Sequence, residues 1–299
     1  MKRFLRKFAL FLIFTISLNV LLLLVVVSLN RFAVDNCELA DGVTSVIIGD
    51  SHTNWSIDAT EIAGVENISF NAEGYVYTFH KLKHLLSKED NVSHVYLGFG
   101  YHNLSDYYDE YIFGSLSKNF VHRYIGVMPI GDLFKVILKN PGEFGDIFRR
   151  ILQKGGESGL KQQCSLYGTF PAERKMESYD PSQMEKRILA QYFNADGTLR
   201  GVSENNLEYL DKIIALLRKN NVDITLLNTP LHTGYVNAIP EEFKSLYHGY
   251  LDLNQLNAYE FEDLALSDAE FLPDGDHVNY DGAILTTERF KFYHENFLE

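Results

Sequence analysis

The stretch VTSVIIGDSH at residues 43–52 decides the fold class of this chain. Its β-branched and aliphatic residues from Val43 to Ile48 are typical of a short strand buried in a parallel sheet. Gly49 ends that pattern, and the polar Ser51 follows where the chain turns from strand toward helix. Clefts of open α/β sheets lie beyond the carboxyl ends of the strands. The stretch therefore predicts a first strand with a hydroxyl at the mouth of a cleft.

Strand and helix patterns alternate along most of the remaining chain. Strands are predicted at 67–70, 92–98 and 222–227, and helices at 75–86, 207–217 and 281–297. Strands that alternate with helices form a parallel sheet with helices on both of its faces. We expect one globular α/β domain over residues 32–299, with a short linker at about 30–41.

Residues 105–199 are rich in Phe and Tyr and predict a mostly helical insertion. Helical patterns occur at 130–138 and 144–152, whereas the glycines of 154–159 (KGGESG) indicate a loop. Aromatic residues at helical spacing belong more often to a core than to a binding site, so we assign no chemistry to the insertion. Insertions at strand ends commonly shape pockets, and this one can cap the cleft.

The composition is that of a globular protein with an acidic surface. Of 299 residues, 46% are hydrophobic and 22% are charged, which is unlike a disordered chain. The net charge is -13, and all five basic residues among the first 31 come without an acid, which leaves 22 basic and 40 acidic residues beyond them. Nucleic-acid binding needs clustered Lys and Arg, so nucleic acid is not an expected partner.

The first 31 residues predict a membrane anchor. Residues 8–29 carry no charge over 22 positions, and as a helix they would span about 33 Å, enough to cross a bilayer. Four basic residues precede this segment and one follows it, so the N-terminus is expected in the cytoplasm and the rest outside. Neither 28–31 nor 33–37 resembles a cleavage site or a lipoprotein box. We expect an uncleaved single-pass anchor, with cleavage as the alternative.

Cys37 and Cys164 both follow the anchor. An oxidising compartment would permit a disulfide between them, and two free thiols are the alternative that the sequence leaves open. No CxxC pair or Cys/His cluster indicates structural zinc, and we expect no metal and no cofactor.

A second polar motif stands near the other end of the chain. In PDGDHVNYDGA at residues 273–283, Asp274 precedes His277 by three positions in a loop before the last predicted helix. A serine needs a base to take its proton, and the base needs a carboxylate to fix its tautomer. Ser51, His277 and Asp274 can fill these roles, with Asp276 as a rival to Asp274.

These motifs resemble the SGNH (GDSL-type) hydrolase superfamily. The resemblance rests on Gly-Asp-Ser after the first strand, Asp-x-x-His before the last helix, and Asn and Gly motifs between them. It implies a flavodoxin-like three-layer α/β/α fold and hydrolysis or transfer of acyl groups. It also implies that Ser51 is the nucleophile, His277 the general base and Asp274 its partner, because the family spacing favours Asp274 over Asp276.

The resemblance further implies an oxyanion hole. In this family the hole consists of the amide of the nucleophile, a Gly amide and an Asn side chain, which are already aimed at the developing negative charge. Ser51 and Gly74, within Asn-Ala-Glu-Gly at 71–74, match the first two. The third block reads Gly-Tyr-His-Asn at 100–103, so either His102 or Asn103 stands in the donor position, and Asn103 is preferred.

The expected function is therefore a membrane-anchored esterase or O-acyltransferase outside the cytoplasm. Its expected substrates are acyl esters, acetyl above all, of cell-envelope polysaccharides, because anchored members of the resembled family often modify surface glycans. Two alternatives stay open. The chain can be a non-catalytic glycan-binding module or a partner of an integral-membrane acyltransferase. Asp50 and His52 also form an Asp-x-His pair of the kind found in metal-dependent phosphoesterases, although the other metal-binding motifs of that class are missing from the sequence.

Overall fold

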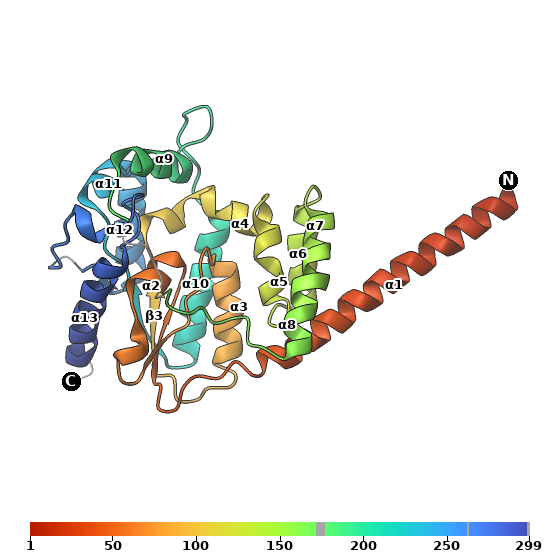
Figure 1. The fold of residues 1–299 in the computed structure, drawn as a ribbon, viewed down its shortest axis with the longest axis horizontal. Coiled ribbons are helices and arrows are strands. Elements are labelled where there is room, and N and C mark those ends of the chain that lie inside the picture. The colour runs from red at the N-terminus through yellow and green to blue at the C-terminus, as the bar shows by residue number, and fades with distance from the viewer. Residues whose placement is uncertain (172–176, 262, 298–299) are drawn as a thin grey trace. The chain divides into compact units, whose positions relative to one another are not determined.

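The structure is a computed structural model that describes residues 1–171, 177–261 and 263–297. The chain forms two compact units (Figure 1). The helical unit contains Met1–Glu38 and Phe113–Leu166, and the sheet unit contains Leu39–Ile112 and Tyr167–Glu299. The predicted insertion at 105–199 extends beyond the helical unit on both sides, since residues next to it belong to the sheet unit.

The sheet has five parallel strands among the described residues, in the order β2-β1-β3-β4-β5. This 2-1-3-4-5 order is that of flavodoxin-like folds, in which the ligand site lies where the strand order reverses, beside β1 and β3. The predicted α/β class with a parallel sheet is confirmed. The strands are β1 (Ser45–Ile48), β2 (Val65–Asn67), β3 (His94–Gly98), β4 (Asp223–Leu227) and β5 (Ala258–Tyr259).

Helices cover both faces of the sheet (Figure 1). On one face Val46, Val95 and Leu226 pack with side chains of α3, α10 and α12, and on the other face Ile47 and Tyr96 pack with the C-terminal helix α13. Successive residues of a strand thus point to opposite faces of the sheet and pack in two separate hydrophobic cores. The helices of this unit are α2 (Ser51–Ser56), α3 (Tyr75–Leu85), α9 (Pro181–Tyr192), α10 (Glu204–Lys219), α11 (Thr233–Ala238), α12 (Glu241–Asn254) and α13 (Tyr280–Phe297).

Short 3-10 turns complete the sheet unit, and α4 (Glu110–Phe113) leads the chain out of it. The turns are Ala59–Glu61, Tyr101–Leu104, Asp106–Asp109 and Asp268–Glu270.

The helical unit is built around the long N-terminal helix α1 (Lys2–Val34). It is long and apolar enough to cross a membrane, which confirms the apolar N-terminal helix, and it continues through the first residues of the predicted linker. From Leu23 onward one side of α1 is buried in the unit. The other elements are the 3-10 turn Ser117–Asn119, α5 (Val121–Tyr124), α6 (Ile130–Lys139), α7 (Phe144–Arg150), the π-helical turn Ile151–Gly155 and α8 (Gly156–Lys161).

The loop predicted at 154–159 is wrong, because these residues are helical. Their glycines allow close packing rather than a turn. A Cβ atom on Gly159 would lie 2.8 Å from Cβ of Leu29 in α1, and one on Gly155 would lie 2.8 Å from Cδ1 of Ile125. The side chain of Asn30 also donates a hydrogen bond to the carbonyl of Gly155 at 2.6 Å. Glycine is needed here because the helices lie in close contact. The sequence rules that associate glycine with turns do not take such contacts into account.

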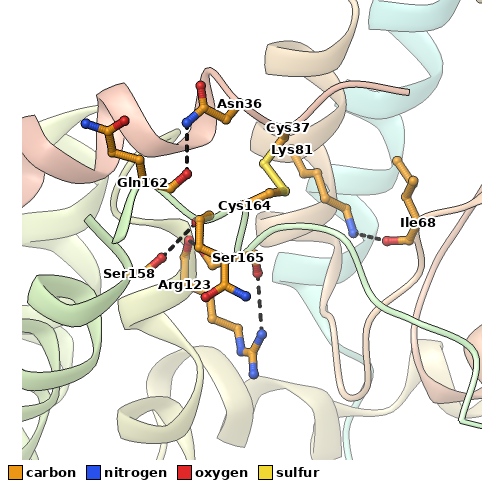
Figure 2. Close-up of a disulfide and its surroundings, with 10 residues drawn as sticks. Asn36, Cys37, Ile68, Lys81, Arg123, Ser158, Gln162, Cys164 and Ser165 are labelled. Atoms are coloured by element: carbon orange, nitrogen blue, oxygen red, sulfur yellow. Dashed lines mark hydrogen bonds between the residues drawn. A yellow bond between two sulfur atoms is a disulfide. The ribbon is translucent and has the colours of Figure 1, made fainter. Parts of the chain in front are cut away.

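Cys37 and Cys164 form a disulfide, with their Cα atoms 5.0 Å apart (Figure 2). The bond joins the two chain segments of the helical unit, since Cys37 follows α1 and Cys164 follows α8. Close to it, the side chain of Asn36 donates to the carbonyl of Gln162 at 2.8 Å. Of the two states that the sequence left open, the structure contains the disulfide.

Candidate active site

Ser51 is the first residue of α2, directly after the carboxyl end of β1. Asp50 caps this helix, because its side chain accepts a hydrogen bond from the amide of His52 at 2.9 Å. The tight passage between strand and helix requires glycine at position 49, where a Cβ atom would lie 3.1 Å from Cα of Gly98 in the neighbouring strand. The local sequence thus places the hydroxyl of Ser51 just beyond the carboxyl end of β1.

Ser51, His277 and Asp274 form a continuous chain of hydrogen bonds. Oγ of Ser51 lies 2.9 Å from Nε2 of His277, and Nδ1 of His277 lies 2.8 Å from Oδ2 of Asp274. The backbone amides of Asp276 and His277 donate to the other oxygen of Asp274, at 3.1 and 3.2 Å. Gly275 permits this turn with a left-handed φ of 64°. Two segments separated by 226 residues meet here.

The electrostatics keep His277 neutral and Asp274 charged. Burial is the main cause that lowers the pKa of His277 below its usual 6.5. The negative charge of Asp274 raises this pKa and the positive charge of His52 lowers it, and the net effect is a lowered pKa. For Asp274, burial would raise the pKa, but its interaction and hydrogen bond with the adjacent His277 outweigh burial, and the pKa is lowered. A carboxylate on Nδ1 fixes the proton there, so Nε2 can accept the proton of Ser51.

Asp276, the predicted rival, does not occupy the position of Asp274. It is fully buried, and its Oδ1 lies 2.9 Å from Nε2 of His52. Its second oxygen accepts hydrogen bonds from Arg187 at 2.6 Å and Gln191 at 3.0 Å, both on α9. The two acids of the loop therefore have separate partners.

His102 and Asn103 of the Gly-Tyr-His-Asn motif at 100–103, together with Tyr108, surround the carboxylate of Asp50. Nε2 of His102 lies 2.8 Å from Oδ2 of Asp50, the amide of Asn103 donates to the same oxygen at 2.9 Å, and the hydroxyl of Tyr108 donates to it as well. The ring of His102 also stacks on that of His52, with ring centroids 3.7 Å apart. The amide of Asn103 carries a second N–H beyond the one that Asp50 accepts.

Gly74 lies just before α3 and caps it. A Cβ atom at this position would lie 2.9 Å from Cδ1 of Ile112, so a side chain here would require Ile112 to shift. The preceding residue, Glu73, is fully buried and accepts a hydrogen bond from Nζ of Lys81 at 2.7 Å. Lys81 also donates to the carbonyl of Ile68 at 2.7 Å, which ties the turn before Gly74 to the end of β2.

Sequence reasoning missed the roles of His52, Arg187, Gln191 and Tyr108 around the two carboxylates. In the sequence, the position of His52 two residues after Asp50 indicates only an Asp-x-His metal pair. Arg187 and Gln191 lie on α9, whose start carries a visible signal, Asp180-Pro181, that combines a capping residue with a first-turn proline. For Tyr108 no local pattern marks a contact with Asp50.

Two groups of ligating atoms lie close enough to share a metal ion, namely Asp50 with His52 and His102, and His52 with Asp276 and His277. In the two groups the ring nitrogens of His52 lie within hydrogen-bond distance of the carboxylate oxygens of Asp50 and Asp276.

A cavity of about 840 Å³ lies beside Asp274 in the sheet unit. Residues of α9, including Lys186 and Arg187, line it together with Leu272 and Pro273. Its volume is within the range of small-molecule sites, roughly 300 to 1,000 Å³.

Comparisons with known proteins give little beyond this geometry. No protein-family model matches the chain, and no curated protein matches it. Among solved structures, one from Streptococcus pneumonia, provisionally described as a platelet activating factor, matches with a TM-score of 0.41 and 12% identity. The match covers 95% of this chain and 98% of the other.

Proposed function

We propose that the chain is a serine-dependent esterase or O-acyltransferase of the SGNH type. The observation that carries the proposal is the relay from Ser51 through His277 to Asp274, with distances of 2.9 and 2.8 Å between the paired atoms. Nucleophilic catalysis requires a neutral imidazole and a charged carboxylate. The pKa values of His277 and Asp274 are both lowered, which favours these two states.

In the proposed reaction, Oγ of Ser51 attacks the carbonyl carbon of an ester while its proton passes to Nε2 of His277. The tetrahedral intermediate then expels the alcohol, which takes that proton, and an acyl-Ser51 ester remains. Water or a sugar hydroxyl next attacks this ester and gives its proton to His277. Release of the acid or of the new ester returns the proton to Ser51.

We assign the oxyanion hole to the amides of Ser51 and Gly74 and to the side chain of Asn103. His102 is the weaker candidate, because its Nε2 faces Asp50 and its ring stacks on His52. Loss of one such donor costs about 2.7 to 4 kcal/mol of transition-state stabilisation in other enzymes. Asn103→Ala is expected to lower kcat by a corresponding factor of about 10² to 10³.

We propose acetyl groups of cell-envelope polysaccharides as the substrate. The support is the apolar helix α1, which carries four basic residues at its N-terminal end and would anchor the protein with its sheet unit outside the cytoplasm. The cavity beside Asp274 has the size for part of a glycan chain. An integral-membrane acyltransferase is the proposed protein partner if the enzyme transfers acyl groups.

Hydrolysis of small acetyl esters by the full chain in detergent tests the reaction class. We expect activity in the wild type, near-complete loss in Ser51→Ala, and no change in the matched control Ser87→Ala, an exposed serine of the same unit. Equal hydrolysis by wild type and Ser51→Ala would remove Ser51 from the reaction. A chelator is expected to have no effect, and strong inhibition by EDTA would instead favour the metal-dependent phosphoesterase.

A further inference from the structure

His52 lies between two buried carboxylates. Its Nδ1 is 3.1 Å from Oδ1 of Asp50, and its Nε2 is 2.9 Å from Oδ1 of Asp276. The side chains of all three residues are at most 5% exposed. Two carboxylates buried this close to one imidazole favour a proton on both of its nitrogens.

The charge balance supports a permanent cation at this position. Burial alone would lower the pKa of His52, but Asp276 and Asp50 outweigh burial and raise the pKa to about 10. Arg187 supplies a second positive charge, 2.6 Å from the other oxygen of Asp276. Two cations and two carboxylates therefore neutralise one another, which a buried cluster requires.

The position of His52 in the sequence connects this cluster to the relay. His52 directly follows Ser51, and Asp276 directly precedes His277, so the ion pair ties together the two segments that must meet. The ring of His52 also stacks on that of His277, with centroids 4.4 Å apart and planes at 28°. On its other face it stacks on His102.

We propose that His52 is a positioning residue of the active site. As a cation bound to Asp50 and Asp276, it holds Ser51 beside His277 and disfavours a proton on His277. The catalytic meaning of this role rests on the proposed function, whereas the effect on His277 does not. Neither the proposed oxyanion hole nor the relay from Ser51 to Asp274 accounts for the stacking of a charged His52 on His277.

Other charged and titratable groups also face the two imidazoles. Asp274 touches His277 from its own loop, and Asp276 lies beside both rings. The ring of Trp55 in α2 packs 4.5 Å from that of His277. His102 faces His52 from the third block, and burial lowers the pKa of His102, which leaves it neutral. Arg187 on α9 acts through Asp276.

The first test uses the wild-type chain. Full-length protein with ¹⁵N-labelled histidines is studied in detergent by NMR at pH 8, with His52→Gln for assignment. We expect both ring nitrogens of His52 to be protonated while those of His277 show a neutral ring. A neutral His52 at pH 8 would overturn the proposal, and this measurement needs no variant to be active.

The second test removes the charge. In His52→Gln we expect the titration midpoint of His277 to rise by about one pH unit, because a neighbouring cation is lost. Labelling of Ser51 by a fluorophosphonate at pH 5.5 should then be slower than in the wild type, by at most about tenfold, because a smaller fraction of His277 is neutral. The matched control is Tyr108→Phe, which removes a donor to Asp50 without changing charge and should leave the midpoint of His277 unchanged.

The outcomes separate this proposal from the proposed function. An unchanged midpoint of His277 in His52→Gln, or the same rise in Tyr108→Phe, contradicts the positioning role, whatever Ser51 does. Absence of labelling at Ser51 in the wild type, with the midpoint of His277 still shifted by His52→Gln, contradicts the function and supports the interaction between the two imidazoles.

Discussion

The residues Asp274 and Asp276 show how two identical side chains in one tripeptide acquire different tasks. Asp274 is partly exposed and bonds Nδ1 of His277, whereas Asp276 is fully buried and bonds His52 and Arg187. The spacing of the motif indicated Asp274, but the sequence contained nothing about the partners of Asp276, which come from α2 and α9.

These tasks predict different effects of the same substitution. Asp274→Asn should lower kcat on acetyl esters by about 10³ to 10⁴, because the amide no longer fixes the tautomer of His277, while the melting temperature changes little. Asp276→Asn should lower stability, since it leaves buried His52 and Arg187 with an uncompensated charge, and it should lower kcat less than Asp274→Asn does. Steady-state kinetics and thermal unfolding of both variants check this, and equal kinetic defects in the two would contradict the division.

The lowered pKa of His277 predicts the pH dependence of activity. A base must be neutral to accept the proton of Ser51, and His277 is neutral above a pKa that lies below 6.5. We expect kcat/KM to fall as the pH drops through the pKa of His277, with the midpoint of this acid limb below pH 6.5. A profile whose acid limb has its midpoint above 6.5 would contradict this.

At the scale of the elements, the sequence predicted what local patterns encode. The strands β1, β3 and β4 and the helices α3, α6, α7, α10 and α13 lie where periodicity placed them, within a few residues. The second strand was expected at 67–70 but ends at Asn67, and the two-residue β5 was not predicted. Both strands are short and lie at the edges of the sheet, where little apolar pattern is needed.

The glycines of the helical unit lead to a prediction about packing. Gly159→Ala should destabilise this unit, because its Cβ atom would lie 2.8 Å from Cβ of Leu29 and 3.1 Å from a backbone carbon of that residue. The control is Gly145→Ala in α7, where no atom lies within 4 Å of the added carbon, and it should be neutral or stabilising by about 0.5 to 1 kcal/mol. Thermal unfolding of both variants decides, and equal melting temperatures would contradict the close contact.

At the scale of the whole molecule, the candidate site depends on contacts that cross much of the sequence. His277 reaches Ser51 over 226 residues, and Arg187 reaches Asp276 over 89. The contact between Ser51 and His277 could be predicted, because the order of the motifs matches that of the family the sequence resembles. The second could not be predicted, since it requires the packing of α9, a helix inside the segment interpreted as an insertion without chemistry.

The disulfide gives a prediction about global stability. It closes a loop with a sequence separation of 127, and in the chain-entropy model such a bond contributes roughly 4 to 5 kcal/mol to the free energy of unfolding. Cys37→Ser combined with Cys164→Ser should therefore unfold at lower urea concentration. Reduction of the wild type should reproduce the effect, and a double variant as stable as the oxidised wild type would contradict it.

The account as a whole depends on Ser51 acting as a nucleophile that His277 activates. The most direct measurement is reaction of the full chain with a fluorophosphonate, followed by mass spectrometry of its peptides. We predict one adduct, on Ser51, which is absent from Ser51→Ala and strongly reduced in His277→Ala. An adduct on another residue, or labelling of Ser51 that is unchanged when His277 is replaced, would contradict the account.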